Sequence, residues 1–426
     1  MIGLSLYILA DTYFISKAVG ANGITALNMA LPVYGVIFAL GQMVGVGSAI
    51  RYSIVKEQYR NSNKDGSNEC DKYFSGALFW GLVIGVIFAV VGLVFPDKIV
   101  EIMGGDETIV AIGVPYFRIF MSFSPFFIFN YTCNAFVRND GNPSVSMAAT
   151  LISSLFNIVF DYILMFPLGM GMPGAALATA LSPVVGVMIC MIHFLSKKNT
   201  VKFKWFKTSL TRLFHCCQVG MSAFVGEMSG AVIVMVFNFI ILRLTGNIGV
   251  AAYGVVANTA LVAVAVFNGV ALGSQPLISE SYGKHNIKDI KLIEKLGVAT
   301  ALGLAVIIVM MIWGFTDTIV GVFNSQGSDR LLSLARVGLR IYFIGFLFAG
   351  INIFCSSALS AIASVKWAFV LSILKGFVVV NVCAAILAPI FGMNGVWVAF
   401  PLSEFILLII SGFAMKKSIG ALESER

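Results

Sequence analysis

The sequence predicts an all-α polytopic membrane protein with twelve transmembrane helices arranged as two six-helix lobes. Of its 426 residues, 59% are hydrophobic and 11% are charged, and the mean hydropathy is +0.94. A soluble domain carries roughly 25% charged residues. Apolar runs of about 20 residues, each long enough to cross a bilayer core of roughly 30 Å, recur along the whole chain. The second half also repeats motifs of the first half.

Each apolar run is expected to be a helix, because backbone polar groups have to be satisfied within lipid and no alternating barrel-strand pattern is visible. The expected segments are approximately 1–17, 26–53, 73–95, 109–136, 144–166, 174–195, 216–242, 250–278, 293–315, 331–358, 364–388 and 395–415. The first run is expected to stay as a helix rather than to act as a cleaved signal peptide.

The first predicted helix is short. Only ten residues precede Asp11, which corresponds to about 15 Å of helix at 1.5 Å per residue. That length is about half a membrane crossing.

Basic residues are distributed unevenly between the two sides of the predicted bundle. Twenty Lys and Arg residues fall in loops or segment ends on one side. The opposite side holds four, which are Lys17, Lys98, Arg243 and Arg330. This asymmetry predicts that both termini are cytoplasmic in a multi-pass protein of the cell membrane. The net charge of +8 is therefore explained by membrane orientation, and no nucleic-acid partner is expected.

The two halves of the chain repeat each other with a spacing of about 222 residues. Arg118 and Arg340 are equivalent, as are Gly171 and Gly392. The repeat predicts an N-lobe at 1–200, a basic cytoplasmic linker at 201–212 and a C-lobe at 213–426. With six segments in each lobe, the repeat is parallel, an arrangement typical of transporters with a substrate site between or within two lobes. The alternative is that the duplication serves stability alone.

Four acidic residues lie well inside apolar segments: Asp11, Asp161, Glu227 and Glu404. A charged carboxylate near the bilayer centre costs about 2.5–3.5 kcal/mol on insertion scales, so such residues indicate a functional site by default. Asn157 precedes Asp161 by four residues and shares its helix face. The pair predicts an amide and a titratable acid turned toward a common cavity.

Each of these acids also has a structural interpretation. Asp161 is compatible with capping by a nearby hydroxyl, and Asp11 with a helix end close to the outer interface. Glu227 is interpreted either as a residue that attracts cations or as a hydrogen-bonding strut between helices, and Glu404 more as a strut. The seven cysteines are scattered and show no metal-type spacing. We therefore expect no cofactor, and no metal beyond a coupling ion.

The chain resembles the multidrug and toxic compound extrusion (MATE) family, in a branch with MepA-like and DinF-like exporters, within the multidrug/oligosaccharidyl-lipid/polysaccharide flippase superfamily. The resemblance covers essentially the full length. The motifs that carry it are Asp11–Ser16, Gly45–Ser48, Arg138–Pro143, Asn157–Asp161, Gly171–Thr179, Gly226–Ser229, Asn238, Ala251–Gly254 and Gly392–Gly395.

The resemblance implies an N-lobe cation site built from Asp11, Asn157 and Asp161, which binds protons or sodium. It also implies a C-lobe cation or substrate contact at Glu227 and Asn238. The chain departs from one branch of the family, because residues 340–360 contain no acid. A sodium site of that branch in the C-lobe is therefore not expected. In the family the first helix begins well upstream of its acid, and the resemblance therefore implies that the first helix of this chain is truncated at its N-terminus, through a missing or misassigned start.

These inferences predict a non-enzymatic, monomeric secondary transporter that exports organic, often cationic, drugs in exchange for protons or sodium ions. The alternative is a flippase for lipid-linked oligosaccharides, which would need a strongly cationic cavity. The embedded cations are few: Arg118, Arg336, Arg340 and Lys375. A third class is a passive channel or scaffold, which needs no ion gradient. The expected partners are small-molecule drugs and membrane lipid.

Overall fold

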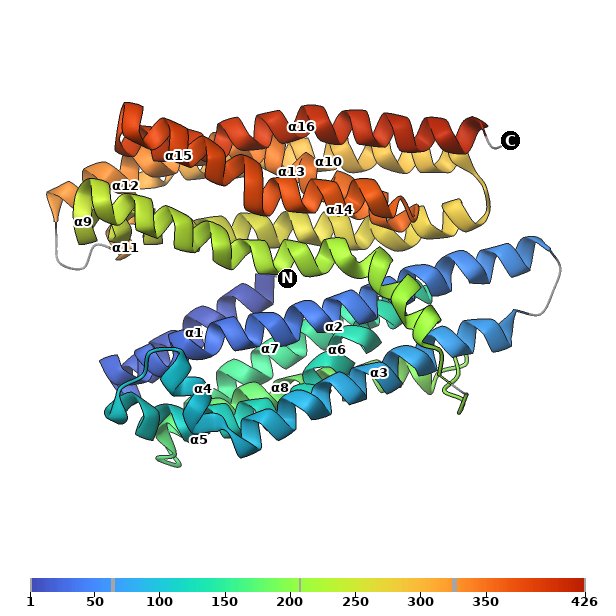
Figure 1. Cartoon of the computed structure of the whole chain (residues 1–426), viewed down its shortest axis with the longest axis horizontal. Coiled ribbons are helices and arrows are strands. Elements are labelled where there is room, and N and C mark those ends of the chain that lie inside the picture. Colours follow the sequence, from blue (N-terminus) through green and yellow to red (C-terminus); the bar gives the residue numbers. More distant parts are fainter. Residues whose placement is uncertain (1, 63–65, 207, 324–327, 425–426) are drawn as a thin grey trace. The chain divides into compact units, whose positions relative to one another are not determined.

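The structure, a computed structural model, describes residues 2–62, 66–206, 208–323 and 328–424, and these residues are almost entirely helical, with no strand among them (Figure 1). Nine of the described helices are long and apolar enough to cross a membrane, and one bent pair makes a tenth span. The predicted all-helical membrane fold is confirmed. Lys64, Lys207 and Arg426, which belong to the predicted cytoplasmic charge, lie outside the described residues.

The chain forms two compact units, Met1–Phe224 and Val225–Arg426. The first unit therefore includes the residues of the expected linker and the start of the helix that follows. The predicted division into lobes at 1–200 and 213–426, joined by a linker at 201–212, refers to the membrane topology of the chain. It stays a prediction.

Eight helices and the start of a ninth make up the N-terminal unit (Figure 1). They are α1 (Ile2–Ala18), α2 (Ala21–Asn61), α3 (Ser67–Val94), α4 (Pro96–Ile102), α5 (Glu107–Ser122), α6 (Ser124–Asn139), α7 (Pro143–Met165), α8 (Gly171–Phe194) and α9 (Leu210–Gly283). The fourth predicted segment is the pair α5 and α6, which is bent by 45°. Pro125 lies in the first turn of α6, where its missing N–H and fixed φ favour a new helix start.

The rest of α9 and the helices after it make up the C-terminal unit. They are α10 (Ile287–Gly314), α11 (Thr316–Phe323), α12 (Asp329–Tyr342), the 3₁₀ turn η1 (Phe343–Gly345), α13 (Phe346–Ala361), α14 (Val365–Ile373), the π-helix η2 (Leu374–Val379), α15 (Val380–Phe391) and α16 (Met393–Ser424). The tenth predicted segment is thus built from α12, η1 and α13, and the eleventh from α14, η2 and α15.

Glycines in the left-handed region separate helices at equivalent places in the two halves. Gly20, between α1 and α2, has φ 81° and ψ −158°. Gly246, at the kink inside α9, has φ 68° and ψ −158°. Only glycine adopts this backbone conformation without strain. The kink at Gly246 divides α9 into the seventh and eighth predicted segments.

Gly246→Ala is expected to destabilise the protein by about 1–3 kcal/mol, because a Cβ is strained in this conformation. The measurement is the melting temperature of the purified protein in detergent. Gly254→Ala is the matched control, since Gly254 is a helical residue of α9 with open space at its Cβ position, and there alanine favours the helix. An equal loss of stability in both variants would contradict the explanation.

One apolar cluster joins the helices that carry the predicted N-lobe acids. It contains Ile15 of α1, Tyr116 of α5, Met165 of α7 and Met172 of α8, all of them buried. Packing of these side chains holds the four helices together. Asp11 on α1 and Asp161 on α7 are therefore positioned by the same core.

The end of α6 is tied to the segment after α8 by the carboxylate of Asp140. This carboxylate accepts hydrogen bonds from the Tyr52 hydroxyl at 2.5 Å, Lys56 Nζ at 2.8 Å and His193 Nε2 at 3.0 Å. The backbone N–H of Thr200 donates to it at 2.9 Å, and the Thr200 hydroxyl donates as well. Burial alone would raise the pKa of Asp140, but the hydrogen bonds hold it below its usual value. These five residues are called the Asp140 cluster below.

The chain that follows Thr200 is held along α3. The backbone N–H of Lys202 donates to Asp71 Oδ1 at 2.8 Å, and Lys204 Nζ lies 2.7 Å from Asp71 Oδ2. The backbone N–H of Lys204 donates to Ser75 Oγ at 3.0 Å. This part of the expected linker is thus packed against the N-terminal unit.

Candidate functional site

Asn157 and Asp161 lie one turn apart on α7, and both side chains are fully buried. Pro143 occupies the first turn of α7, where its fixed φ suits a helix start. Asn157 Nδ2 donates to Thr179 Oγ1 on α8 at 3.3 Å. Asn157 Oδ1 and both carboxyl oxygens of Asp161 have no hydrogen-bond partner among the described residues. The predicted shared face therefore exists, and it presents three oxygens that are not bound.

Asp11 of α1 is the third predicted member of the site. It is buried, and its Oδ1 has no hydrogen-bond partner in the described part of the chain. Helix α1 packs against α7 and α8. The carboxyl groups of Asp11 and Asp161 are close enough to interact electrostatically. The structure thus brings the predicted N-lobe residues together.

Two residues that the sequence did not indicate complete this site. Tyr116 of α5 is buried and close enough to Asp11 and Asp161 to interact with them electrostatically, and Thr179 of α8 accepts the hydrogen bond from Asn157. Thr179 ends the motif Gly171–Thr179, so the resemblance included it without giving it a role. Tyrosine and threonine carry no charge and are common in transmembrane helices. Their presence in an apolar segment therefore does not indicate a functional site.

The arrangement can accept one small cation. Four buried oxygens from Asp11, Asn157 and Asp161 lack partners among the described residues, and an unsatisfied buried polar group costs about 1–3 kcal/mol. A proton or a sodium ion placed between two carboxylates would satisfy these oxygens, and hard cations prefer carboxylate, amide and hydroxyl oxygens as ligands.

No group of three or more His, Cys, Asp or Glu side chains in the described ranges lies close enough to hold a metal ion. The site contains two carboxyls, one amide and two hydroxyls. Its donors are all oxygens, which transition metals favour less than nitrogen and sulfur. The donor set therefore fits a proton or an alkali cation better than a resident transition metal.

The predicted C-lobe residues are not brought together. Glu227 is exposed on α9, and Asn238 lies partly exposed on the same helix. They are eleven positions apart in the sequence, which corresponds to about 16 Å along the helix axis. They do not form one cluster in the way that Asp11, Asn157 and Asp161 do.

Glu404 of α16 is buried, and both of its carboxyl oxygens have a polar partner. Asn352 Nδ2 of α13 donates to Glu404 Oε2 at 2.7 Å and to the Glu404 carbonyl at 2.9 Å. Lys375 Nζ in the π-helix η2 lies 3.6 Å from Glu404 Oε1. These bonds connect three helical elements of the C-terminal unit, as expected for a strut.

A family model described as MatE matches residues 1–163 and 223–390 of the chain. Most of the chain falls within these ranges, including Asp11, Asn157 and Asp161, whereas α8 lies between them.

Two similar relatives are multidrug export proteins. "Multidrug export protein MepA" of Staphylococcus aureus (strain bovine RF122 / ET3-1) is 27% identical over 410 residues, which cover 94% of this chain and 86% of the relative. The protein of the same name from Staphylococcus saprophyticus subsp. saprophyticus is 24% identical over 396 residues, which cover 92% and 85%.

Solved structures share the fold. One is an outward-facing conformation of a multidrug resistance MATE family transporter of the MOP superfamily, which matches with a TM-score of 0.92 and 22% identity. The match covers 100% of this chain and 94% of that structure. At this identity the similarity establishes the architecture alone.

Proposed function

The chain belongs to the MatE family, the transporters that its motifs resemble, and on this basis we propose that it exports organic, often cationic, drugs in exchange for protons or sodium ions. The observation that carries the proposal is the cluster of unpartnered buried oxygens of Asp11, Asn157 and Asp161. A family of exporters and a site suited to one small cation together favour an ion-coupled exporter. The drug export of the named MepA relatives supports the substrate class.

Competition for one site is enough to couple the two flows. An ionised Asp161 attracts a cationic drug from the cytoplasmic side. A proton or sodium ion that enters from outside binds between Asp11 and Asp161, neutralises the site and displaces the drug. Coupling requires only that drug and ion exclude each other or favour different conformations. We propose that the two lobes expose the site alternately to the two sides.

The alternative of a lipid-linked oligosaccharide flippase is not favoured. A pyrophosphate site would need several free cations in the membrane region. Arg336 Nε lies 2.6 Å from Asp317 Oδ1, and Lys375 pairs with Glu404. Two of the four embedded cations are therefore already bound to carboxylates.

Dye transport by the full chain in reconstituted vesicles tests the function. An ethidium-like dye is followed under an imposed proton gradient, under a sodium gradient and with no gradient. The proposal expects uphill dye movement under at least one gradient, and the gradient that works identifies the coupling ion. A passive channel would let the dye equilibrate without a gradient. Absence of uphill dye movement under both the proton and the sodium gradient would reject drug exchange.

A further inference from the structure

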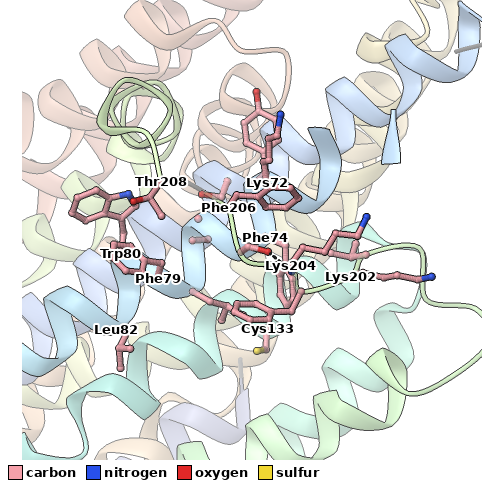
Figure 2. Close-up of a pocket in the computed structure, with 18 of the residues that line it drawn as sticks. Lys72, Phe74, Phe79, Trp80, Leu82, Cys133, Lys202, Lys204, Phe206 and Thr208 are labelled. Carbon is pink, nitrogen blue, oxygen red and sulfur yellow. Dashed lines mark hydrogen bonds between the residues drawn. The ribbon is translucent and has the colours of Figure 1, made fainter. Parts of the chain in front are cut away.

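A pocket of about 710 Å³ opens in the N-terminal unit beside the first half of α3. Its walls come from α3, α6 and α8 and from the chain between Asn199 and Cys216. Figure 2 shows Lys72, Lys202 and Lys204 toward the upper and right-hand part of the view, with Leu82 and Cys133 toward its lower part. The pocket is separate from the Asp11, Asn157 and Asp161 site, because none of those residues lines it.

The pocket has an excess of positive charge at one end. Four cations line it, namely Lys72, Lys202, Lys204 and Arg212. Glu69 pairs with Lys72 and Arg212, and Asp71 pairs with Lys204. For Lys202 no ion pair is found in the described ranges. Two carboxylates therefore face four cations, which leaves a net charge suited to an anion.

Most of the remaining lining residues are apolar, and they continue onto a surface suited to lipid. Leu82 and Phe79 of α3 and Met191 of α8 line the pocket and are themselves exposed. Met188 and Ile192 extend the apolar face of α8. An apolar wall that continues onto an outward helix face accommodates an acyl chain.

The segment that closes the pocket has the composition of a membrane-interface segment. From Val201 to Phe206, basic side chains alternate with apolar ones, and Phe203 and Trp205 are exposed. Aromatic residues favour the headgroup level of a bilayer, and clustered cations mark the cytoplasmic leaflet. With the predicted orientation, the charged end of the pocket is therefore expected at the depth of the inner-leaflet phosphates.

We propose that this pocket binds an anionic phospholipid of the inner leaflet. Its phosphate lies near Lys202 and Arg212, and one acyl chain runs along α3 and α8 past Leu82 and Met191. Organic cations are disfavoured by the net positive charge. A free phosphate would leave the apolar wall unused. The lipid would contact both α3 and the segment that Asp71 and Ser75 hold against it.

Quenching of tryptophan fluorescence by lipid with brominated acyl chains tests the proposal. Trp80 and Trp205 line the pocket, and the other tryptophans belong to the C-terminal unit. The full chain in neutral detergent is titrated with brominated phosphatidylglycerol or brominated phosphatidylcholine. We expect saturable quenching with the anionic lipid alone, and we expect Trp80→Phe to reduce it. Equal, non-saturable quenching by both lipids would overturn the proposal.

Charge variants test the headgroup contact. Lys202→Gln with Arg212→Gln is expected to raise the half-saturating concentration of phosphatidylglycerol about thirty-fold, because each cation near an anionic headgroup contributes about 1 kcal/mol. Lys288→Gln with Lys416→Gln is the matched control, as both residues are exposed cytoplasmic-side cations of the C-terminal unit. If both pairs weaken binding equally, the pocket is not the site. If the double variant does not fold, Lys202→Gln alone replaces it in the test. The single variant is expected to weaken binding of phosphatidylglycerol about fivefold.

A bulk variant tests the acyl-chain wall without changing the charge. Gly76 lines the pocket and has open space at its Cβ position. Gly76→Phe is expected to abolish the saturable quenching, whereas Gly303→Phe, an equally open position on α10, should leave it intact.

Competition with inorganic phosphate separates the two sources of phosphate. Displacement of the lipid by millimolar phosphate would show an anion site rather than a lipid site.

Discussion

Asp161→Asn is expected to lower gradient-driven dye efflux at least about tenfold, which corresponds to about 1.4 kcal/mol of coupling free energy. Asparagine keeps the shape of the side chain but carries no negative charge. It therefore cannot bind a proton or attract a cationic drug, and the exchange loses the group that both ligands share. The measurement is dye efflux from vesicles under the gradient that drives the unaltered protein.

The same substitution is expected to leave the melting temperature unchanged or higher. Neither carboxyl oxygen of Asp161 has a hydrogen-bond partner among the described residues, so no stabilising bond is lost, and removing a buried charge relieves a desolvation penalty. Lost transport with retained stability identifies a functional acid. Asp97→Asn is the matched control, because Asp97 is an exposed acid of α4. Efflux by Asp161→Asn at the original rate would show that the site is assigned wrongly.

The sequence predicted the membrane fold well because hydropathy directly reports which residues lie in lipid. Every predicted segment coincides with one helix or with a bent or kinked run of helices. Hydropathy does not report how far a helix continues into water, so the length of α2 to Asn61 was missed. The short helices α4 and α11 were missed too, although the repeat marks them: Phe95 and Phe315 precede them at equivalent positions.

The sequence predicted only the charged residues of the candidate site and the one residue whose spacing links it to them. Asp11 and Asp161 stand out because an acid in an apolar segment is rare, and Asn157 was found through its spacing from Asp161. Tyr116 reaches the same site from α5 through tertiary packing, which no local pattern reports. Glu227 has the same sequence signal as Asp161 but is exposed, so an embedded acid alone does not reveal its surroundings.

Asp140→Asn is expected to have the opposite effect from Asp161→Asn: a loss of stability of about 3 kcal/mol. The asparagine amide would present N–H groups to Thr200 or His193, which are themselves donors to the carboxylate. We take the lower end of the range for a broken buried ion pair because the Lys56 side chain is 31% exposed and partly solvated. Melting temperatures in detergent measure the loss, again with Asp97→Asn as the control. A melting temperature equal to that of the unaltered protein would show that the Asp140 cluster does not hold the segment after α8.

The pH dependence of this difference provides an independent check. The folded-state pKa of Asp140 lies below its usual value, so the carboxylate stabilises the fold at every pH above its unfolded pKa of about 3.9. The contribution is lost only as pH falls through the lower folded pKa. The stability difference between the unaltered protein and Asp140→Asn should therefore shrink as the pH falls below about 4. Tyr52, Lys56 and His193 face the carboxylate, and all three are retained in the variant. A difference that grows as the pH falls below about 4 would mean that Asp140 is bound in its protonated form, and would contradict the charged cluster.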